Sequence, residues 1–130
     1  MNTYRFKTVL LIDDNTIDNF INTKLITKAG FSEKVIEKTS AISALDFLRE
    51  IKNEEEVPDV ILLDIMMPVM DGFEFLEQYD KMPADVKSKS RVVMLSSTES
   101  FKDLNRANSN PYVYKFLNKP LTEAVLAAIR

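Results

Sequence analysis

Residues 60–64 read VILLD, a run of four apolar residues that ends in an aspartate. An apolar run without polar alternation is typical of a strand in a parallel sheet that helices cover on both faces. Comparable runs are VLLI at 9–12 and VVML at 92–95, with a mixed aromatic run at 112–117 and a weaker one at 35–36. The chain is therefore predicted to contain five strands of this kind.

Helical patterns occupy the intervals between these runs. In the first interval, the spacing of Ile17, Phe20, Ile21, Leu25 and Ala29 gives one apolar stripe along a predicted helix, and Gly30 stands where a glycine commonly ends a helix. A second helix is indicated by an apolar stripe over 41–51 with Ser40 as its N-cap, and a third by Asp71 and Gly72 before the apolar residues Phe73, Leu76 and Tyr79. A weaker pattern over 100–107 indicates a fourth helix, and Thr122 before residues 123–129 indicates a fifth. Alternating β and α elements predict an α/β fold with a parallel sheet and right-handed crossovers.

Composition excludes several classes of function. The chain has 130 residues, which corresponds to one domain over 1–130. It lacks cysteine and histidine, which excludes disulfides, zinc thiolate sites, Cys nucleophiles, Ser-His-Asp triads and histidine metal sites. Its only glycines are Gly30 and Gly72, too few for a P-loop or a dinucleotide-binding loop. A net charge of −3 argues against nucleic acid as the main partner.

No apolar run in the sequence approaches the ~20 residues that a membrane span needs. The N-terminal residues reach the acidic pair Asp13 and Asp14 too early for a signal peptide. We therefore expect a cytoplasmic protein without a membrane partner. The acidic run at 54–56 and the long charged segment at 81–90 are expected to be exposed loops.

Three aspartates directly follow predicted strands: Asp13 and Asp14 after the run at 9–12, and Asp64 after the run at 60–63. The carboxyl ends of parallel strands share one edge of the sheet, where ligands of open α/β sheets bind. Any one of these aspartates alone is well explained as a helix cap. When they lie together, their negative charges repel one another. The repulsion energy of two full charges ~4 Å apart is roughly 4 kcal/mol at an effective dielectric constant of 20. A hard divalent cation such as Mg2+ would relieve that repulsion.

Two further side chains complete the predicted site. Ser96 ends the fourth run and offers a hydroxyl, and Lys119 follows the last run, before Pro120. The bond to Pro120 adopts the cis form at low cost, which would turn the lysine inward. Taken singly, such a Ser is usually a turn residue and such a Lys a solvated one. Together the groups suit phosphoryl transfer, with Asp64 as the nucleophile and the Asp13-Asp14 pair as metal ligands.

At these positions the sequence resembles the receiver domain of two-component response regulators. The resemblance rests on LLIDDN at 10–15, LLDIMMPVMDG at 62–72, MLSS at 94–97 and FLNKPL at 116–121. Each segment alone is weakly specific, whereas all four in this order cover essentially the whole chain. The resemblance implies a CheY-like, flavodoxin-like doubly wound sandwich of five βα units with strand order 2-1-3-4-5.

The resemblance also implies a role for each site residue. Asp64 corresponds to the phosphoacceptor, Asp14 to the direct Mg2+ ligand, and Asp13 to a ligand that acts mainly through a metal-bound water. The backbone carbonyl of Met66 corresponds to a further metal ligand, and Ser96 corresponds to the switch residue that binds the phosphoryl group. Lys119, before a cis Pro120, corresponds to the lysine that pairs with phosphate, and Phe116 corresponds to the aromatic switch residue. Core packing in a strand explains Phe116 about as well.

The implied function is a phosphorylation-activated switch. A sensor histidine kinase or a phosphotransfer domain supplies the phosphoryl group, and the surface of the fourth helix, fifth strand and last helix changes shape to contact an unidentified downstream protein. Such a protein is not an enzyme, because it catalyses only its own phosphorylation and dephosphorylation. The resemblance also allows a homodimer through this surface on phosphorylation. The chain ends at Arg130 without room for an output domain, so we expect a stand-alone receiver or an excised domain.

Some positions depart from the commonest pattern of the family. Ser97 replaces the usual Ala or Gly, and residues 110–112 (NPY) replace the common Gly-Ala before the last strand. Met66 and Thr98 occupy two positions that tune dephosphorylation, and neither side chain is suited to position an attacking water. We therefore expect the phosphorylated form to last for minutes or longer.

Two other interpretations stay open. A Mg2+-dependent phosphatase with an Asp nucleophile shares the acidic strand ends, but such enzymes usually place two aspartates two residues apart, where this chain has adjacent Asp13 and Asp14. A degenerate receiver would serve only as an interaction module, although all the site residues are present here. Labelling with a small phosphodonor distinguishes the phosphorylated switch, the phosphatase and the interaction module.

Overall fold

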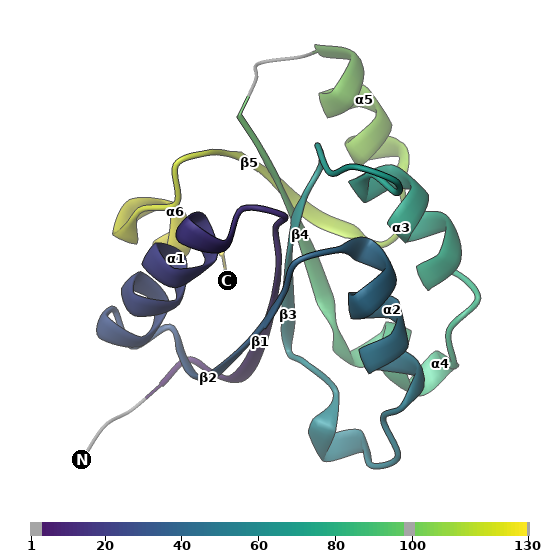
Figure 1. Ribbon diagram of the computed structural model, residues 1–130, viewed down its shortest axis with the longest axis horizontal. Coiled ribbons are helices and arrows are strands. Elements are labelled where there is room, and N and C mark those ends of the chain that lie inside the picture. The colour runs from purple at the N-terminus through teal and green to yellow at the C-terminus, as the bar shows by residue number, and fades with distance from the viewer. Residues whose placement is uncertain (1–3, 98–100, 130) are drawn as a thin grey trace.

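A computed structural model describes residues 4–97 and 101–129, and its centre is a five-stranded parallel sheet with the order β2-β1-β3-β4-β5 (Figure 1), as the resemblance implied. The strands are β1 (Phe6–Ile12), β2 (Ser32–Lys38), β3 (Val60–Asp64), β4 (Arg91–Ser96) and β5 (Val113–Asn118). The helices are α1 (Thr16–Lys28), α2 (Ala41–Arg49), α3 (Gly72–Tyr79), α4 (Ala84–Lys89), α5 (Phe101–Ser109) and α6 (Glu123–Ala127), with a short 3-10 turn η1 (Glu54–Glu56). None of the described helices is long and apolar enough to cross a membrane.

Helices cover both faces of the sheet. Helices α1 and α6 lie on one face, and α2, α3, α4 and α5 lie on the other (Figure 1). Successive strand residues point to opposite faces, so Leu10 and Ile12 pack under α2 and α3 while Val9 and Leu11 pack under α1 and α6. This burial on two sides is the physical reason why the strands are apolar throughout rather than alternating.

Side-chain caps set where several helices begin. The Oδ1 atom of Asn15 accepts the backbone N–H groups of Ile17 and Asp18 at 3.0 Å each, at the start of α1. Asp71 and Glu74 form a reciprocal capping box at the start of α3. Ser40 and Thr122 cap α2 and α6, as their sequence predicted. Because Asn15 and Asp71 lie close after β1 and β3, these caps also order the loops at the carboxyl edge of the sheet.

The expectation that residues 81–90 form a loop throughout is wrong. Helix α4 spans Ala84–Lys89 and begins after Pro83. Val86 is buried in the core on the same face of the sheet as α3, which stabilises a helix too short to persist alone. The extra helix shifts the numbering, so the surface expected to signal downstream consists here of α5, β5 and α6.

The expected orientation of α1 is also wrong. Ile17, Phe20 and Ile21 belong to the predicted apolar stripe, yet they are 69%, 59% and 56% exposed. The helix instead turns Asn19 and Ile26 toward the sheet, and both are fully buried. The Nδ2 of Asn19 donates a hydrogen bond of 2.9 Å to the backbone carbonyl of Asp13, which holds the helix in this rotation.

Candidate functional site

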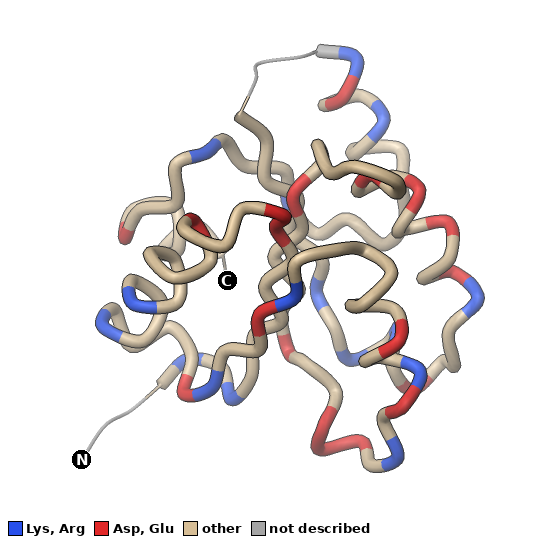
Figure 2. Tube along the Cα trace, viewed as in Figure 1, with Lys and Arg blue, Asp and Glu red and all other residues tan. Residues whose placement is uncertain are grey.

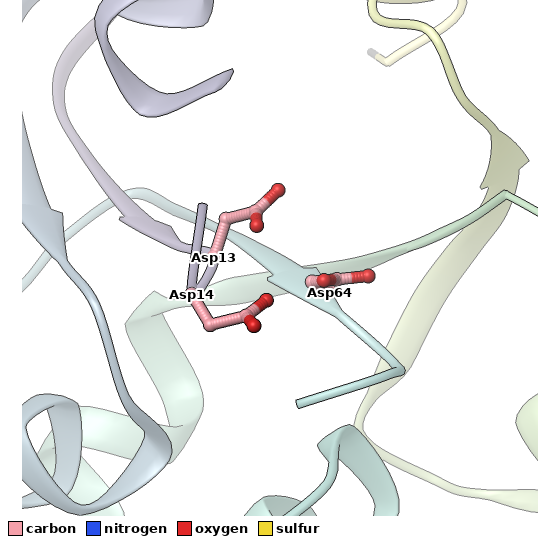
Figure 3. A group of neighbouring side chains, drawn as sticks. All are labelled: Asp13, Asp14 and Asp64. Atoms are coloured by element: carbon pink, nitrogen blue, oxygen red, sulfur yellow. The ribbon is translucent and has the colours of Figure 1, made fainter. Parts of the chain in front are cut away.

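The three predicted aspartates lie together at the carboxyl edge of the sheet. Strands β1 and β3 are neighbours with Ile12 opposite Leu63, so Asp13 and Asp64 emerge side by side. One carboxylate oxygen from each of Asp13, Asp14 and Asp64 lies within 4.8 Å of the other two (Figure 3). Asp13 and Asp64 are buried and Asp14 is exposed, so the cluster reaches the protein surface through Asp14.

The predicted lysine belongs to the same cluster. Lys119 directly follows β5, and its peptide bond to Pro120 is cis, as expected. The Nζ atom of Lys119 lies 2.8 Å from Oδ2 of Asp13 and 3.3 Å from Oδ1 of Asp64. The backbone N–H of Lys119 donates to the carbonyl of Ser96 at 2.8 Å, which ties the end of β5 to the end of β4. One ammonium therefore bridges the two buried carboxylates.

Ser96 and Phe116 occupy neighbouring strands beside this cluster. Ser96 is buried at the end of β4, one position beyond Leu95, which is the β4 neighbour of Asp64. Phe116 lies in β5 opposite Met94 and is half-buried against the core on the face of the sheet that α2, α3, α4 and α5 cover. Both residues lie where the sequence placed them, and their switching roles stay predictions.

The loop between β3 and α3 borders the acidic cluster. Val69 has a φ of 70°, and the N–H of Met70 donates to the carbonyl of Pro68 at 2.8 Å, so these residues form a tight three-residue turn. Positive φ is unfavourable for a β-branched residue, and Val69 is 88% exposed, so packing contributes little at this position. Met66 in the same loop is also exposed. Thr98, the second residue expected to tune dephosphorylation, lies outside the described residues.

Asn19 supports the site, although the sequence pattern of the first helix did not indicate such a role. It is fully buried, and its hydrogen bond to the carbonyl of Asp13 fixes the backbone at that position. The N–H of Asn15 also donates to Oδ1 of Asp13, at 3.0 Å. The available signal was a polar residue among the apolar positions of the first helix. This signal was not sufficient to predict that Asn19 faces the site, because the rotation of the helix about its axis depends on the surface against which it packs.

Gly72 allows the loop after Asp64 to close tightly. A Cβ atom at this position would lie 2.8 Å from the backbone oxygen of Asp64, closer than Cβ atoms approach other atoms, and 3.0 Å from the Cα of Ile65, which is tighter than most such contacts. The N–H of Gly72 donates to the carbonyl of Ile65 at 2.8 Å. Glycine is therefore required for close backbone approach beside Asp64, a role that the sequence pattern did not indicate.

Crowding shifts the pKa values of two groups in the cluster. Burial is the largest influence on Asp64 and raises its pKa above the ordinary 3.8; the Lys119 ammonium lowers it and the Asp13 charge raises it, with a net upward shift. Burial lowers the pKa of Lys119, but its contacts with Asp13 and Asp64 outweigh this effect and raise it above 10.5. Lys119 is therefore charged at neutral pH, while the ionised form of Asp64 is incompletely compensated.

The donor set fits a hard divalent cation. Asp13, Asp14 and Asp64 offer carboxylate oxygens only, which Mg2+ prefers over softer ligands. Mg2+ usually binds one or two protein carboxylates and keeps positions for water and phosphate oxygens. The exposed Asp14 places such a site where a phosphoryl group is able to reach it. An acidic triad of this kind is typical of the Mg2+ site of receivers.

A protein-family model described as the response regulator receiver domain matches residues 9–129. The chain therefore belongs to the receiver (CheY-like) domain family of two-component response regulators. Members of this family are typically phosphoacceptor switches rather than enzymes.

Curated relatives agree with this assignment. The probable methanogenesis regulatory protein FilR2 of Methanothrix harundinacea is 31% identical over 115 residues, which cover 88% of this chain and 72% of FilR2. The sensor histidine kinase CheAY of Helicobacter pylori is 38% identical over 73 residues, which cover 56% of this chain but only 8% of CheAY. The matched region is thus a large part of one relative and a small part of the other.

Solved structures show the same fold. A response regulator receiver protein from Dyadobacter fermentans is 36% identical, with a TM-score of 0.85 over 95% of this chain and 94% of that chain. The receiver domain of the sensor histidine kinase PA1611 from Pseudomonas aeruginosa was crystallised with a magnesium ion coordinated in its active site cleft. It is 20% identical, with a TM-score of 0.74 over 95% of this chain and 93% of that chain, a likeness that shows the fold alone.

Proposed function

We propose that this chain is a phosphorylation-activated switch of a two-component phosphorelay, with residues 1–130 as its receiver domain. In this proposal Asp64 accepts a phosphoryl group from a phosphohistidine of a sensor histidine kinase or a phosphotransfer domain. The observation that carries the proposal is the position of the Asp64 carboxylate, 3.3 Å from Nζ of Lys119 and beside two further carboxylates. A carboxylate between an ammonium and a cation site is well placed to receive a phosphoryl group, because both positive charges stabilise the oxygens in transfer.

The transfer forms one bond and breaks one bond. An oxygen of the Asp64 carboxylate attacks phosphorus, and the P–N bond of phosphohistidine breaks with its electron pair returning to the imidazole nitrogen. The ammonium of Lys119 donates hydrogen bonds to the phosphoryl oxygens and holds the acyl phosphate that results. Mg2+ held by Asp13, Asp14, Asp64 and the backbone carbonyl of Met66 would supply further positive charge for these oxygens.

Ser96 and Phe116 are proposed to transmit the change. A phosphoryl group on Asp64 adds strong acceptor oxygens next to β4, where the Ser96 hydroxyl is a donor. As Ser96 moves toward these oxygens, the half-buried ring of Phe116 turns into the space that Ser96 leaves. The surface of α5, β5 and α6 then takes a second arrangement that a downstream protein recognises. Support for this step is the placement of Ser96 and Phe116 on adjacent strands.

Labelling with acetyl phosphate and Mg2+ tests the proposal, with intact mass as the readout. We expect one phosphate adduct on the wild-type chain, and neither an adduct on Asp64→Asn nor one on the wild type in excess EDTA. Asp59→Asn is the matched control and keeps the adduct, because Asp59 lies at the opposite end of β3. Absence of an adduct on the folded wild type would instead indicate an interaction module. Sustained hydrolysis of unrelated phosphate esters would indicate a phosphatase.

The lifetime of the adduct is tested in the same preparation. The exposed Met66 side chain has no group that orients water, which supports slow hydrolysis of the acyl phosphate. After removal of acetyl phosphate by rapid desalting in Mg2+, we expect the adduct to persist for minutes or longer. Loss within seconds would contradict this part of the proposal and leave the phosphoacceptor role intact.

A further inference from the structure

Met66 is the most exposed methionine among the residues that the structure describes. It is 67% exposed, whereas Met67 and Met82 are 8% and 6% exposed. Met94 is fully buried, and Met70 is partly buried against the core. Hydrogen peroxide oxidises a thioether to a sulfoxide, and it must reach the sulfur atom to do so. Among the described methionines, Met66 is therefore the one that this oxidant reaches most readily.

Met66 also lies beside the proposed phosphoacceptor. It follows Asp64 by two residues, in the loop between β3 and α3, and its backbone N–H donates a hydrogen bond to the Asp64 carboxylate. Asp64 is only 6% exposed, so the solvent that approaches it borders on its exposed neighbours Asp14 and Met66. A change in the polarity of the Met66 side chain is therefore a change on the solvent side of the acidic cluster.

Oxidation changes the hydrogen-bonding capacity of this side chain. The thioether sulfur attacks one oxygen of hydrogen peroxide, an S–O bond forms, the O–O bond breaks, and water leaves. Sulfur gives up the electron pair that peroxide takes up. A thioether is only a weak hydrogen-bond acceptor, whereas the sulfoxide is polar and carries an acceptor oxygen. Met66 thereby gains a group that holds water, which the unoxidised side chain lacks.

The fold tolerates this change at Met66 better than at the other described methionines. A sulfoxide on the buried Met94 would place a polar group in the core without a partner. A sulfoxide on the exposed Met66 stays in water and is accessible to methionine sulfoxide reductases, which return it to the thioether. Oxidation at Met66 is therefore reversible and leaves the core intact. The charged residues of both signs remain as they are along the chain trace (Figure 2).

We propose that Met66 is a site of reversible oxidation by peroxide, and that its sulfoxide shortens the lifetime of the phosphorylated chain. This inference rests on the proposed phosphorylation of Asp64. The sulfoxide oxygen accepts a hydrogen bond from a water molecule beside the acyl phosphate and so orients that water toward phosphorus. The water oxygen bonds to phosphorus, and the bond from phosphorus to the Asp64 oxygen breaks with its electron pair returning to the carboxylate. The proton of the water passes to the solvent, because a sulfoxide is too weak a base to keep it.

Peptide mapping by mass spectrometry tests the oxidation step without any phosphorylation. The full chain is exposed briefly to increasing concentrations of hydrogen peroxide, and the sulfoxide at each methionine is measured. We expect Met66 to be oxidised at lower peroxide than the buried Met67, Met82 and Met94. Circular dichroism and thermal unfolding before and after this treatment should show that the chain remains folded.

The decay of the acyl phosphate tests the second step. The oxidised chain is freed of peroxide by desalting, labelled with acetyl phosphate and Mg2+, and desalted again, and intact mass follows the loss of the adduct. We expect decay about twofold to tenfold faster than in the untreated chain, which is the change that one net hydrogen bond corresponds to. Methionine sulfoxide reductases should restore the slower decay.

Three variants assign the response to Met66. Met66→Leu has no sulfur at this position, so its adduct should decay at the same rate before and after peroxide. Met66→Gln carries a permanent acceptor oxygen, and its adduct should decay faster than that of Met66→Leu without any peroxide. Met70→Leu is the matched control, since Met70 belongs to the same loop but is partly buried, and it should keep the full response to peroxide.

Three results would overturn the inference. The first is oxidation of a buried methionine at the same peroxide concentration as Met66. The second is a chain with Met66 fully oxidised whose adduct decays no faster than that of the untreated chain. The third is a response to peroxide that Met66→Leu retains. Absence of an adduct on the untreated chain is a different result, because it would overturn the proposed phosphorylation of Asp64 and this inference with it.

Discussion

Strand β3 has an aspartate at each end, and the two carboxylates are held in opposite ways. Asp59, directly before the strand, accepts the backbone N–H groups of Lys7 and Thr8 with Oδ2, at 2.9 and 3.1 Å. Nζ of Lys89 lies 3.9 Å from its Oδ1. The Asp59 backbone also bonds to Thr8 and Arg91. Asp59 therefore joins the first residues of three strands, and donors already occupy its oxygens.

Asp64, at the other end, shares a single ammonium with a second buried carboxylate. Nζ of Lys119 lies closer to Asp13 than to Asp64, at 2.8 against 3.3 Å, and Asp14 adds a third carboxylate. Among the described side chains of this cluster, negative charges outnumber positive ones. Asp59 stabilises the fold because its charge is satisfied, whereas Asp64 is suited to chemistry because its charge is not.

The largest expected effect is a difference in stability between variants of the two lysines that lie next to these aspartates, Lys119 and Lys89. Lys119→Met leaves two buried carboxylates without their ammonium and should lower the free energy of unfolding by about 3 kcal/mol in the absence of Mg2+. Lys89→Met removes a longer, partly exposed pair and should cost less than about 1 kcal/mol. Urea unfolding of both variants measures the difference. Added Mg2+ should recover part of the loss in Lys119→Met only; equal losses would remove the distinction between the two ends.

The two aspartates should respond to neutralisation with opposite signs. Asp59→Ala leaves two backbone N–H groups without their acceptor and should cost about 2 kcal/mol. Asp64→Asn removes an incompletely compensated charge and should stabilise the protein by about 1 kcal/mol. Thermal unfolding in EDTA measures both, and Asp59→Asn, which keeps an acceptor oxygen, serves as the control with a smaller loss. A loss of stability in Asp64→Asn would show that Lys119 compensates Asp64 more fully than the geometry indicates.

A pH series sharpens the same comparison. The folded pKa of Asp64 lies above its unfolded value of 3.8, so the folded state holds this proton more tightly. The stability contributed by protonated Asp64 is fully present below 3.8 and is lost as pH rises through the folded pKa. The stability advantage of Asp64→Asn over wild type should therefore be greatest at neutral pH and shrink toward about pH 4. Denaturant unfolding in EDTA at several pH values measures this gap, and a constant gap would contradict the raised pKa.

The smallest expected effect concerns the backbone of the loop after Asp64. Val69 has a φ of 70°, a region that asparagine adopts more readily than a β-branched residue. Val69→Asn should therefore stabilise the protein by about 0.5–1 kcal/mol. Val69→Thr retains the β-branch and should give no such gain, which separates backbone strain from the loss of an exposed apolar group. An equal gain in both variants would point to exposure as the cause.

Much of the fold and site could be predicted because the signals are local. An uninterrupted apolar run such as 60–63 requires cover on both faces, wherever the strand lies in the sheet. Ser40 and Thr122 cap helices through bonds to residues a few positions away. The aspartates at the ends of the first and third runs share an edge because parallel strands point the same way.

Other features depended on contacts between distant segments. The pattern of the first helix correctly indicated a helix, but its rotation was set by Ile26 and by the hydrogen bond from Asn19 to Asp13. Residues 84–89 carry weak helical signals, and burial of Val86 in the core stabilises the helix there. Such outcomes depend on which surfaces meet, and a one-dimensional pattern does not contain that information.

The sequence by itself determined the βα alternation, the acidic residues at the strand ends and the lysine before a proline, because each follows from short-range pattern and residue chemistry. Only the tertiary structure decided that Lys119 is shared between Asp13 and Asp64, that Asp59 is satisfied while Asp64 is not, and that the apolar residues of α1 face outward. These properties depend on distances between side chains from different strands and helices, and packing of the whole chain sets those distances.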